Sequence, residues 1–199
     1  GLRGERGPGK NKLGGIKMSA RNTASSKRAL QRQNIRRMVM GGMFGAICVV
    51  LGVSGIGMIP VPNLSGHATI MHLPVIIAAV LEGPVVGAFT GLIMGIYSFM
   101  TASAIPPNPF VAILPRILIG VISAYVYRAF GRHTTLGAAF AGFIGTITNT
   151  VGYIGMAILM GYYPMAIWLM ILPQFIVELI LATVLTVALV RVIQRAMPT

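Results

Sequence analysis

The sequence predicts an all-α integral membrane protein with six transmembrane helices and both termini in the cytoplasm. Three observations lead to this prediction: the composition, the succession of apolar runs and the positions of Lys and Arg. Of the 199 residues, 55% belong to the set AVILMFWYC and only 10% are charged. Soluble domains typically carry about 25% charged and 45–50% apolar residues, so the composition nearly excludes a water-soluble enzyme.

Most of the net charge of +13 lies at one end of the chain. Residues 1–37 contain eleven Lys and Arg against one Glu, whereas residues 38–199 contain five Arg against two Glu. Such a basic segment also occurs in nucleic-acid binding arms. Because it has no aromatic residues to stack on bases and an apolar run follows it at once, we expect a disordered cytoplasmic tail and no nucleic-acid partner. Residues 38–195 then form the membrane domain.

Six apolar runs are long enough for membrane helices, which need about 20 residues. Pro60 ends the first run, because proline cannot donate the helical hydrogen bond. A tight turn at residues 82–84 joins the second and third runs as a hairpin. The proline-rich residues 105–109 end the third run, and Gly161 separates the last two. The predicted spans are residues 38–59, 67–82, 84–103, 109–129, 135–160 and 164–190.

The orientation follows from Lys and Arg, which are enriched in cytoplasmic loops. Every basic residue except one lies in the tail, in the turn at residues 128–133 or in the C-terminal residues 191–195. Six spans place these three regions on the same side of the membrane, whereas five or seven would scatter them. The loops without Lys or Arg are expected to face outward, at residues 60–66, 104–108 and 161–163.

Arg116 is the basic residue that this topology does not explain. It lies one to two turns into the fourth span from the outer side, too deep for an anchor at the end of a helix. Ionisable groups in the hydrocarbon region are costly and are functional candidates by default. Two interpretations remain open: Arg116 forms a structural ion pair with Glu178, near the middle of the sixth span, or it binds a ligand.

Other polar side chains lie at a similar depth on different helices. Asn149 and Tyr153, and likewise Gln174 and Glu178, are four residues apart and share a helical face. These positions allow a common cavity open to the outside. The alternative for Asn149 and Gln174 is hydrogen bonding between helices.

Three further residues are candidates with an alternative structural role. His67 and His72, at the start of the second span, either cap that helix or hydrogen-bond the preceding loop, or they contact a ligand. A metal site is not expected, because no Cys, Asp or Glu lies nearby in sequence to complete it. Trp168 belongs either to the aromatic belt at the membrane interface or to the ligand site.

Small residues spaced four apart mark two helix faces. One contains Gly87, Gly91 and Gly95 of the third span, and the other contains Gly42 and Ala46 of the first span. Small residues let another helix approach closely. Docking of a partner subunit and packing within the chain are both compatible with this pattern.

Two segments resemble a known family. They are ATIMHLPVIIAAVLEGPVVGAFTG at residues 68–91 and NPFVAILPRILIG at residues 108–120. Both are similar to the substrate-binding S component of energy-coupling factor (ECF) vitamin transporters, and the likeness extends over residues 38–195. Within that family the chain most resembles the subfamily assigned to pantothenate.

The resemblance implies a multi-pass subunit of a prokaryotic cell membrane that captures a small water-soluble vitamin from outside. It implies a lid formed by the loop between the first two helices, which contains Asn63. It also implies association with a transmembrane coupling subunit, which would contact the two small-residue faces, and with two ATPase subunits. ATP is then used by the partners, and no cofactor is expected in this chain, which has no ATPase motif.

The polar residues are compatible with such a ligand. A buried guanidinium binds a carboxylate bidentately, and amide and hydroxyl neighbours suit a small anionic molecule. Pantothenate has one carboxylate, one amide and two hydroxyls, whereas a cation such as thiamine would require more carboxylates. Folate, riboflavin and cobalamin are alternative vitamins. The expected contacts are Arg116, Asn149, Tyr153 and Gln174, with Glu178 contacting either the ligand or Arg116.

Two other classes of function are less favoured. An intramembrane enzyme would use His67 or His72 with a glutamate for acid–base chemistry. The chain has no H-E-x-x-H motif, no G-x-S-x-G motif and no pair of neighbouring acids, so no enzymatic activity is expected. A purely structural membrane subunit would leave Arg116 unexplained.

Overall fold

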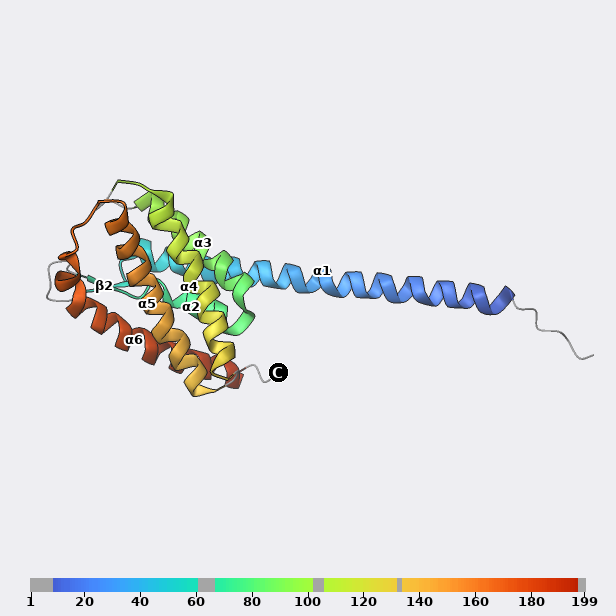
Figure 1. Ribbon diagram of the computed structural model, residues 1–199. Helices are drawn as coiled ribbons and strands as arrows, with labels where there is room; N and C mark the ends of the chain where they lie inside the picture. The colour runs from blue at the N-terminus through green and yellow to red at the C-terminus, as the bar shows by residue number, and fades with distance from the viewer. Residues whose placement is uncertain (1–8, 61–66, 102–105, 132–133, 197–199) are drawn as a thin grey trace, which may run out of the picture. The chain divides into compact units, whose positions relative to one another are not determined.

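The computed structural model describes residues 9–60, 67–101, 106–131 and 134–196 (Figure 1). Contacts divide the chain into two units, Gly1–Met38 and Val39–Thr199. The structure has helix from Gly9 onward, where the sequence analysis expected a disordered tail. The elements in chain order are α1 (Gly9–Val53), β1 (Met58–Pro60), β2 (His67–Thr69), α2 (Leu73–Glu82), α3 (Pro84–Thr101), α4 (Pro109–Ala129), α5 (Thr135–Leu159) and α6 (Ile167–Ala196).

Five helices in the described part of the chain are long and apolar enough to cross a membrane. They are α3 to α6 and the part of α1 over Ser25–Val53. The predicted spans at residues 84–103, 109–129 and 135–160 agree with α3, α4 and α5 to within two residues at each end. The structure therefore has the all-helical membrane architecture that the composition predicted.

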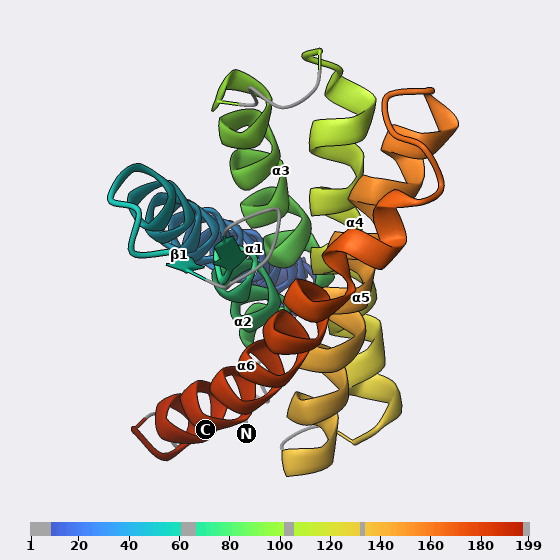
Figure 2. The same ribbon diagram turned by 90° about the vertical axis from the view of Figure 1, so that its left-hand side faces the viewer.

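The second predicted span, residues 67–82, is wrong as a continuous membrane helix. Its first residues form β2, which pairs antiparallel with β1 so that Met58 lies opposite Thr69. Only the ten residues of α2 are helical, about 15 Å of helix against a hydrocarbon core of about 30 Å. Every residue from Leu73 to Val80 is buried, so α2 is enclosed by the other helices (Figure 2).

The membrane part of α1 lies along α3 in the same direction. Moving along α1, a Cβ atom on Gly41 would meet Phe89, one on Gly45 would meet Ile93, and one on Gly52 would meet Tyr97. Thr90 also donates a hydrogen bond to the carbonyl of Gly41 at 3.3 Å. Contacts that advance together on both helices mean that α1 and α3 run parallel.

The glycine face of α3 packs against α4. A Cβ atom on Gly95 would lie 2.8 Å from the Cα of Ile113, and one on Gly91 would meet the carbonyl of Arg116. A Cβ atom on Gly87 would lie 2.9 Å from the carbonyl oxygen of Gly120. The prediction of a partner-docking face at Gly87, Gly91 and Gly95 is therefore wrong, because a helix of the same chain occupies that face.

Gly42 and Ala46 lie on a different face of α1 from the residues that contact α3. A Cβ atom added to Gly42 would meet nothing within 4 Å, and Ala46 is exposed. This second small-residue face stays open in the structure.

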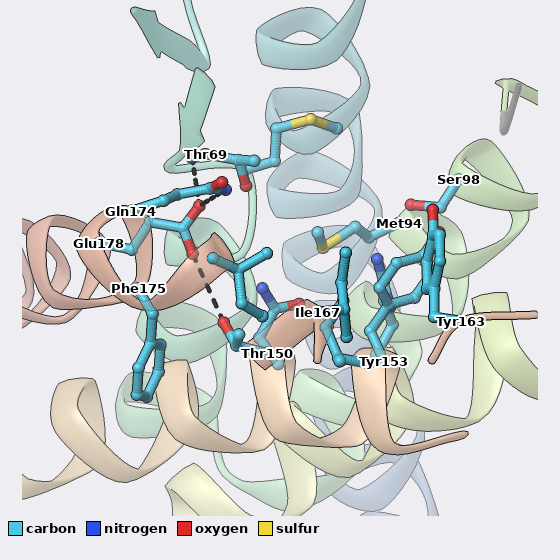
Figure 3. Close-up of a pocket in the computed structure, with 15 residues that line it drawn as sticks. Thr69, Met94, Ser98, Thr150, Tyr153, Tyr163, Ile167, Gln174, Phe175 and Glu178 are labelled. Carbon is cyan, nitrogen blue, oxygen red and sulfur yellow. Dashed lines mark hydrogen bonds between the residues drawn. The ribbon is translucent and has the colours of Figure 1, made fainter. Parts of the chain in front are cut away.

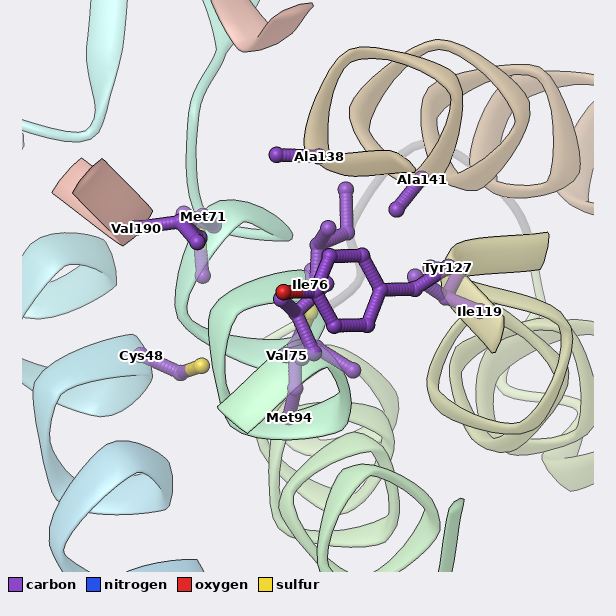
Figure 4. Close-up of a cluster of buried hydrophobic side chains, with 11 residues drawn as sticks. Cys48, Met71, Val75, Ile76, Met94, Ile119, Tyr127, Ala138, Ala141 and Val190 are labelled. Carbon is purple, nitrogen blue, oxygen red and sulfur yellow. The ribbon is translucent and has the colours of Figure 1, made fainter. Parts of the chain in front are cut away.

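A core of buried apolar side chains surrounds α2 (Figure 4). Val75 and Ile76 of α2 are fully buried beside Ile119 of α4 and Ala141 of α5. Cys48 of α1 is fully buried in the same cluster. Its thiol thus packs as a small apolar group.

Arg128 and Arg191 lie at one end of the bundle. Arg191 near the end of α6 donates a hydrogen bond to Thr135 at the start of α5. A Cβ atom on Gly83, in the turn between α2 and α3, would lie 2.9 Å from Arg128 at the end of α4. At the opposite end, Asn108 donates a hydrogen bond to the hydroxyl of Tyr162 at 3.2 Å.

The contact between α3 and α4 gives a first test. We expect Gly91→Ala to lower the free energy of unfolding by about 1–3 kcal/mol, because the added methyl group must displace backbone atoms. Gly42→Ala adds the same group where the space is empty, and we expect no loss of stability. Thermal unfolding in detergent measures both. Equal stability of the two variants would contradict the packing of α3 on α4 described above.

Candidate functional site

The membrane domain contains a cavity of about 320 Å³. It lies beyond the first residue of α2, where the short helix leaves the space between α3, α4, α5 and α6 unfilled. Its walls are largely apolar and enclose a few polar side chains, as is typical of small-molecule sites. The lining residues are Thr69, Met71, Met94, Ser98, Arg116, Asn149, Thr150, Tyr153, Ile154, Tyr163, Ile167, Ile171, Gln174, Phe175 and Glu178.

Arg116 reaches the cavity from α4, two turns after the helix begins. Its guanidinium carbon lies 4.5 Å from the centre of the Tyr153 ring, a cation–π contact. The atoms Nε and Nη1 are buried, and neither has a hydrogen-bond partner among the described residues. Because buried donors are normally paired and an unpaired buried charge is costly, these two donors are suited to bind a ligand acceptor.

The neighbouring helices fix the position of Arg116. Pro115, just before it, is buried, and a Cβ atom on Gly152 of α5 would lie 3.0 Å from the Pro115 ring. On the other side, Gly91 of α3 allows the backbone of Arg116 to approach closely. The backbone at Pro115 and Arg116 is thus held between α3 and α5 by contacts that only small residues permit.

Glu178 enters the cavity from α6 and is held by three donors. Its Oε1 accepts a hydrogen bond from the backbone N–H of Thr69 at 2.6 Å and another from the amide of Gln174 at 2.9 Å. Its Oε2 accepts one from the hydroxyl of Thr150 at 3.4 Å (Figure 3). The hydrogen bonds of Glu178 therefore go to β2, α5 and its own helix rather than to Arg116.

The two charged groups occupy different parts of the cavity. Thr150, which bonds Glu178, and Tyr153, which lies under the guanidinium, are almost one turn apart on α5, about 4.5 Å along the helix axis. Figure 3 shows Glu178 and Gln174 on one side of Thr150, and Tyr153 with Tyr163 on the other. Asn149 also lines the cavity, and its Oδ1 is buried without a partner among the described residues.

Five of the nine predicted binding residues come together in this cavity: Arg116, Asn149, Tyr153, Gln174 and Glu178. They come from three helices, as their depth in the membrane indicated.

Two predicted binding residues do not line the cavity. His72 is fully buried, and its Nε2 lies 3.0 Å from the hydroxyl of Thr146 on α5. It occupies the N-cap position of α2 but makes no capping hydrogen bond through its side chain. Trp168 is partly exposed, and Ile167 and Ile171 of the same helix line the cavity instead. Asn63 and the side chain of His67 lie outside the described residues.

Some lining residues were not predicted, in particular Ser98, Thr150 and Met94. Ser and Thr hydroxyls in helices commonly bond the preceding turn, so a single hydroxyl in an apolar helix does not reveal whether it faces a cavity. Thr69 also lines the cavity and was not predicted to do so. It is the last residue of β2, where the sequence predicted a helix.

A family model described as "ECF transporter, substrate-specific component" matches residues 36–190. The pantothenic acid transporter PanT of Lactococcus lactis subsp. cremoris is 31% identical over 182 residues, which cover 77% of this chain and 91% of that protein. The pantothenate transporter PanT of Leuconostoc mesenteroides subsp. mesenteroides is 29% identical over 146 residues, which cover 65% of this chain and 72% of that protein.

In the absence of ligand, the buried guanidinium of Arg116 is expected to lower the free energy of unfolding. We expect Arg116→Met not to destabilise the ligand-free protein, because an apolar side chain of similar length removes an uncompensated buried charge and keeps the contact with Tyr153. Glu178→Met should lower stability by about 1–3 kcal/mol, because the N–H of Thr69 loses its acceptor. Thermal unfolding of both ligand-free variants in detergent is the measurement. Strong destabilisation by Arg116→Met would mean that Arg116 holds the fold together.

Proposed function

We propose that this chain, which belongs to the family of ECF transporter substrate-specific components, binds pantothenate in the cavity and serves its import. The chain is a multi-pass protein of the prokaryotic plasma membrane. Both relatives reported above are named as transporters of pantothenate, and the chain covers most of each. The observation that carries the proposal is the buried guanidinium of Arg116 in the wall of the cavity, whose Nε and Nη1 have no hydrogen-bond partner among the described residues.

The chemistry of pantothenate suits this guanidinium. The molecule has one carboxylate, and a guanidinium can hold it through two parallel hydrogen bonds. The amide in the middle of the molecule carries an N–H that the unpaired Oδ1 of Asn149 can accept. The ring of Tyr153 holds the guanidinium of Arg116 through a cation–π contact. Met94 and Ile171 provide apolar surface for the two methyl groups of the ligand.

The size and charge of the cavity argue against the other vitamins. A volume of about 320 Å³ lies at the lower end of the range for small-molecule sites. Cobalamin is far larger than this space. Riboflavin carries a flat three-ring system that a cavity of this volume does not suit. Folate has two carboxylates, whereas one cation lines the cavity in the described part of the chain. Thiamine is a cation, and the positive charge of Arg116 would repel it.

The topology in this proposal has six crossings, although only five helices are long enough alone. Since α1 and α3 run parallel and α2 turns directly into α3, the segment from the end of α1 to Glu82 must return through the membrane. The hairpin β1–β2 with residues 70–72 accounts for the outer half of this crossing and α2 for the inner half. Both termini then lie in the cytoplasm, which agrees with the position of Arg128 and Arg191 at one end.

Import requires partners, since transport against a gradient needs an energy source. By family membership, a transmembrane coupling subunit and two ATPases provide it, and the face of α1 at Gly42 and Ala46 is the contact that we assign to the coupling subunit. That face is open, and small residues on it let a partner helix approach closely.

Arg116 gives the direct test of the ligand site. We expect Arg116→Ala to weaken pantothenate binding about 100-fold or more, because the ligand carboxylate would lose a buried charged partner. Titration calorimetry of the purified chain measures the affinity. Panthenol, in which an alcohol replaces the carboxylate, is the matched ligand and should bind both forms weakly and alike. Unchanged pantothenate affinity of the variant would refute the role of Arg116.

The open face of α1 gives a separate test. We expect Gly42→Trp to reduce copurification with the coupling subunit and uptake, while pantothenate binding by the isolated chain stays normal. Ile180→Trp, at an exposed position of α6, is the control and should leave copurification intact. If Gly42→Trp assembled and transported normally, the docking site would have to lie elsewhere.

A further inference from the structure

We propose that Glu178 receives the hydroxyl end of the ligand and thereby excludes derivatives that carry an anionic group at that end, above all the ester phosphorylated on the terminal hydroxyl. This inference rests on the proposed function, because it concerns the orientation of pantothenate in the same cavity. It assigns Glu178 a role in specificity that the identity of the ligand does not require.

The first argument is the arrangement of donors around Glu178. A backbone N–H, an amide and a hydroxyl all direct hydrogens toward its carboxylate, the surroundings that suit an ionised group. Oε1 accepts two hydrogen bonds at 2.6 and 2.9 Å, whereas Oε2 accepts one long bond at 3.4 Å from Thr150. A carboxylate oxygen has room for a second donor, and Oε2 is therefore the atom available to a ligand hydroxyl.

The second argument is the order of polar groups along the cavity. The cation of Arg116 lies at the level of Tyr153, the carboxylate of Glu178 lies at the level of Thr150, and Asn149 lines the cavity from the same helix. Pantothenate has the complementary polarity, with an anion at one end and hydroxyl donors at the other. Only one orientation of the ligand pairs both ends, with its carboxylate at Arg116 and its hydroxyls at Glu178.

The consequence concerns what the cavity rejects. A phosphate ester of the terminal hydroxyl replaces a hydrogen-bond donor with a dianion and places it against the carboxylate of Glu178. Juxtaposed like charges strongly disfavour binding, and partly buried charges are screened less than exposed ones. The reversed orientation would place the phosphate at Arg116 but the ligand carboxylate at Glu178. Neither orientation avoids repulsion, so the site selects the unphosphorylated vitamin.

Titration calorimetry of the purified full chain with three ligands tests this inference. The ligands are pantothenate, its terminal phosphate ester and the neutral acetate ester of the same hydroxyl. We expect the wild-type chain to bind the phosphate ester at least about 100-fold more weakly than pantothenate, and the acetate ester with a smaller loss. Glu178→Gln, which retains an acceptor for Thr69, should reduce the preference for pantothenate over the phosphate ester at least about tenfold. Glu82→Gln makes the same change outside the cavity and should retain the wild-type preference.

The outcomes separate this inference from the proposed function. If the wild-type chain does not bind pantothenate, the proposed function is wrong and this inference falls with it. If it binds pantothenate but accepts the phosphate ester equally well, only the role of Glu178 is refuted. Equal rejection of the two esters by the wild-type chain, or an unchanged preference in a folded Glu178→Gln variant, would attribute the selection to size and likewise refute that role.

Discussion

The site depends on one constraint, the half-length of α2. Ten residues cannot fill a crossing, so the bundle is packed solidly only in the half where α2 lies. There Val75 and Ile76 are fully buried, and every residue of α2 up to Val80 is enclosed. In the other half the same neighbours, α3 to α6, surround a cavity. A full-length second helix would fill that space, so the break before Leu73 is the structural origin of the site.

A cavity within a helix bundle persists only if the surrounding helices do not collapse into it. Close contacts at glycine residues hold these helices in place. Gly87, Gly91 and Gly95 bring α3 against α4 at backbone distance, while Gly152 brings α5 against Pro115. Such close contacts gain dispersion and fix the helices in one register. They also determine where Arg116 lies. Packing of the backbone thus fixes the position of Arg116, whose Nε and Nη1 have no hydrogen-bond partner among the described residues.

The sequence predicted α3, α4 and α5 closely because proline or glycine marks their ends, and it predicted Arg116 and Glu178 because charges in apolar runs are rare. It could not predict the hairpin before α2, since residues 67–72 contain no proline or glycine that would end a helix and strand pairing is a contact between distant residues. Nor could it assign the small-residue faces. Gly91 and Gly42 belong to the same kind of pattern, and only the neighbours of each distinguish an internal contact from an open face.

Opposite charges in one apolar cavity would be expected to pair with each other, and their separation requires a cause. At low dielectric their attraction is strong, but each group already has competing partners. Tyr153 holds the guanidinium through its ring, and three donors hold the carboxylate of Glu178. An ion pair between Arg116 and Glu178 would give up these contacts and close the cavity. Because the two charges stay apart, the cavity keeps a cation in one part and a carboxylate in another. A ligand with an anion and hydrogen-bond donors at the matching ends gains the most binding free energy there.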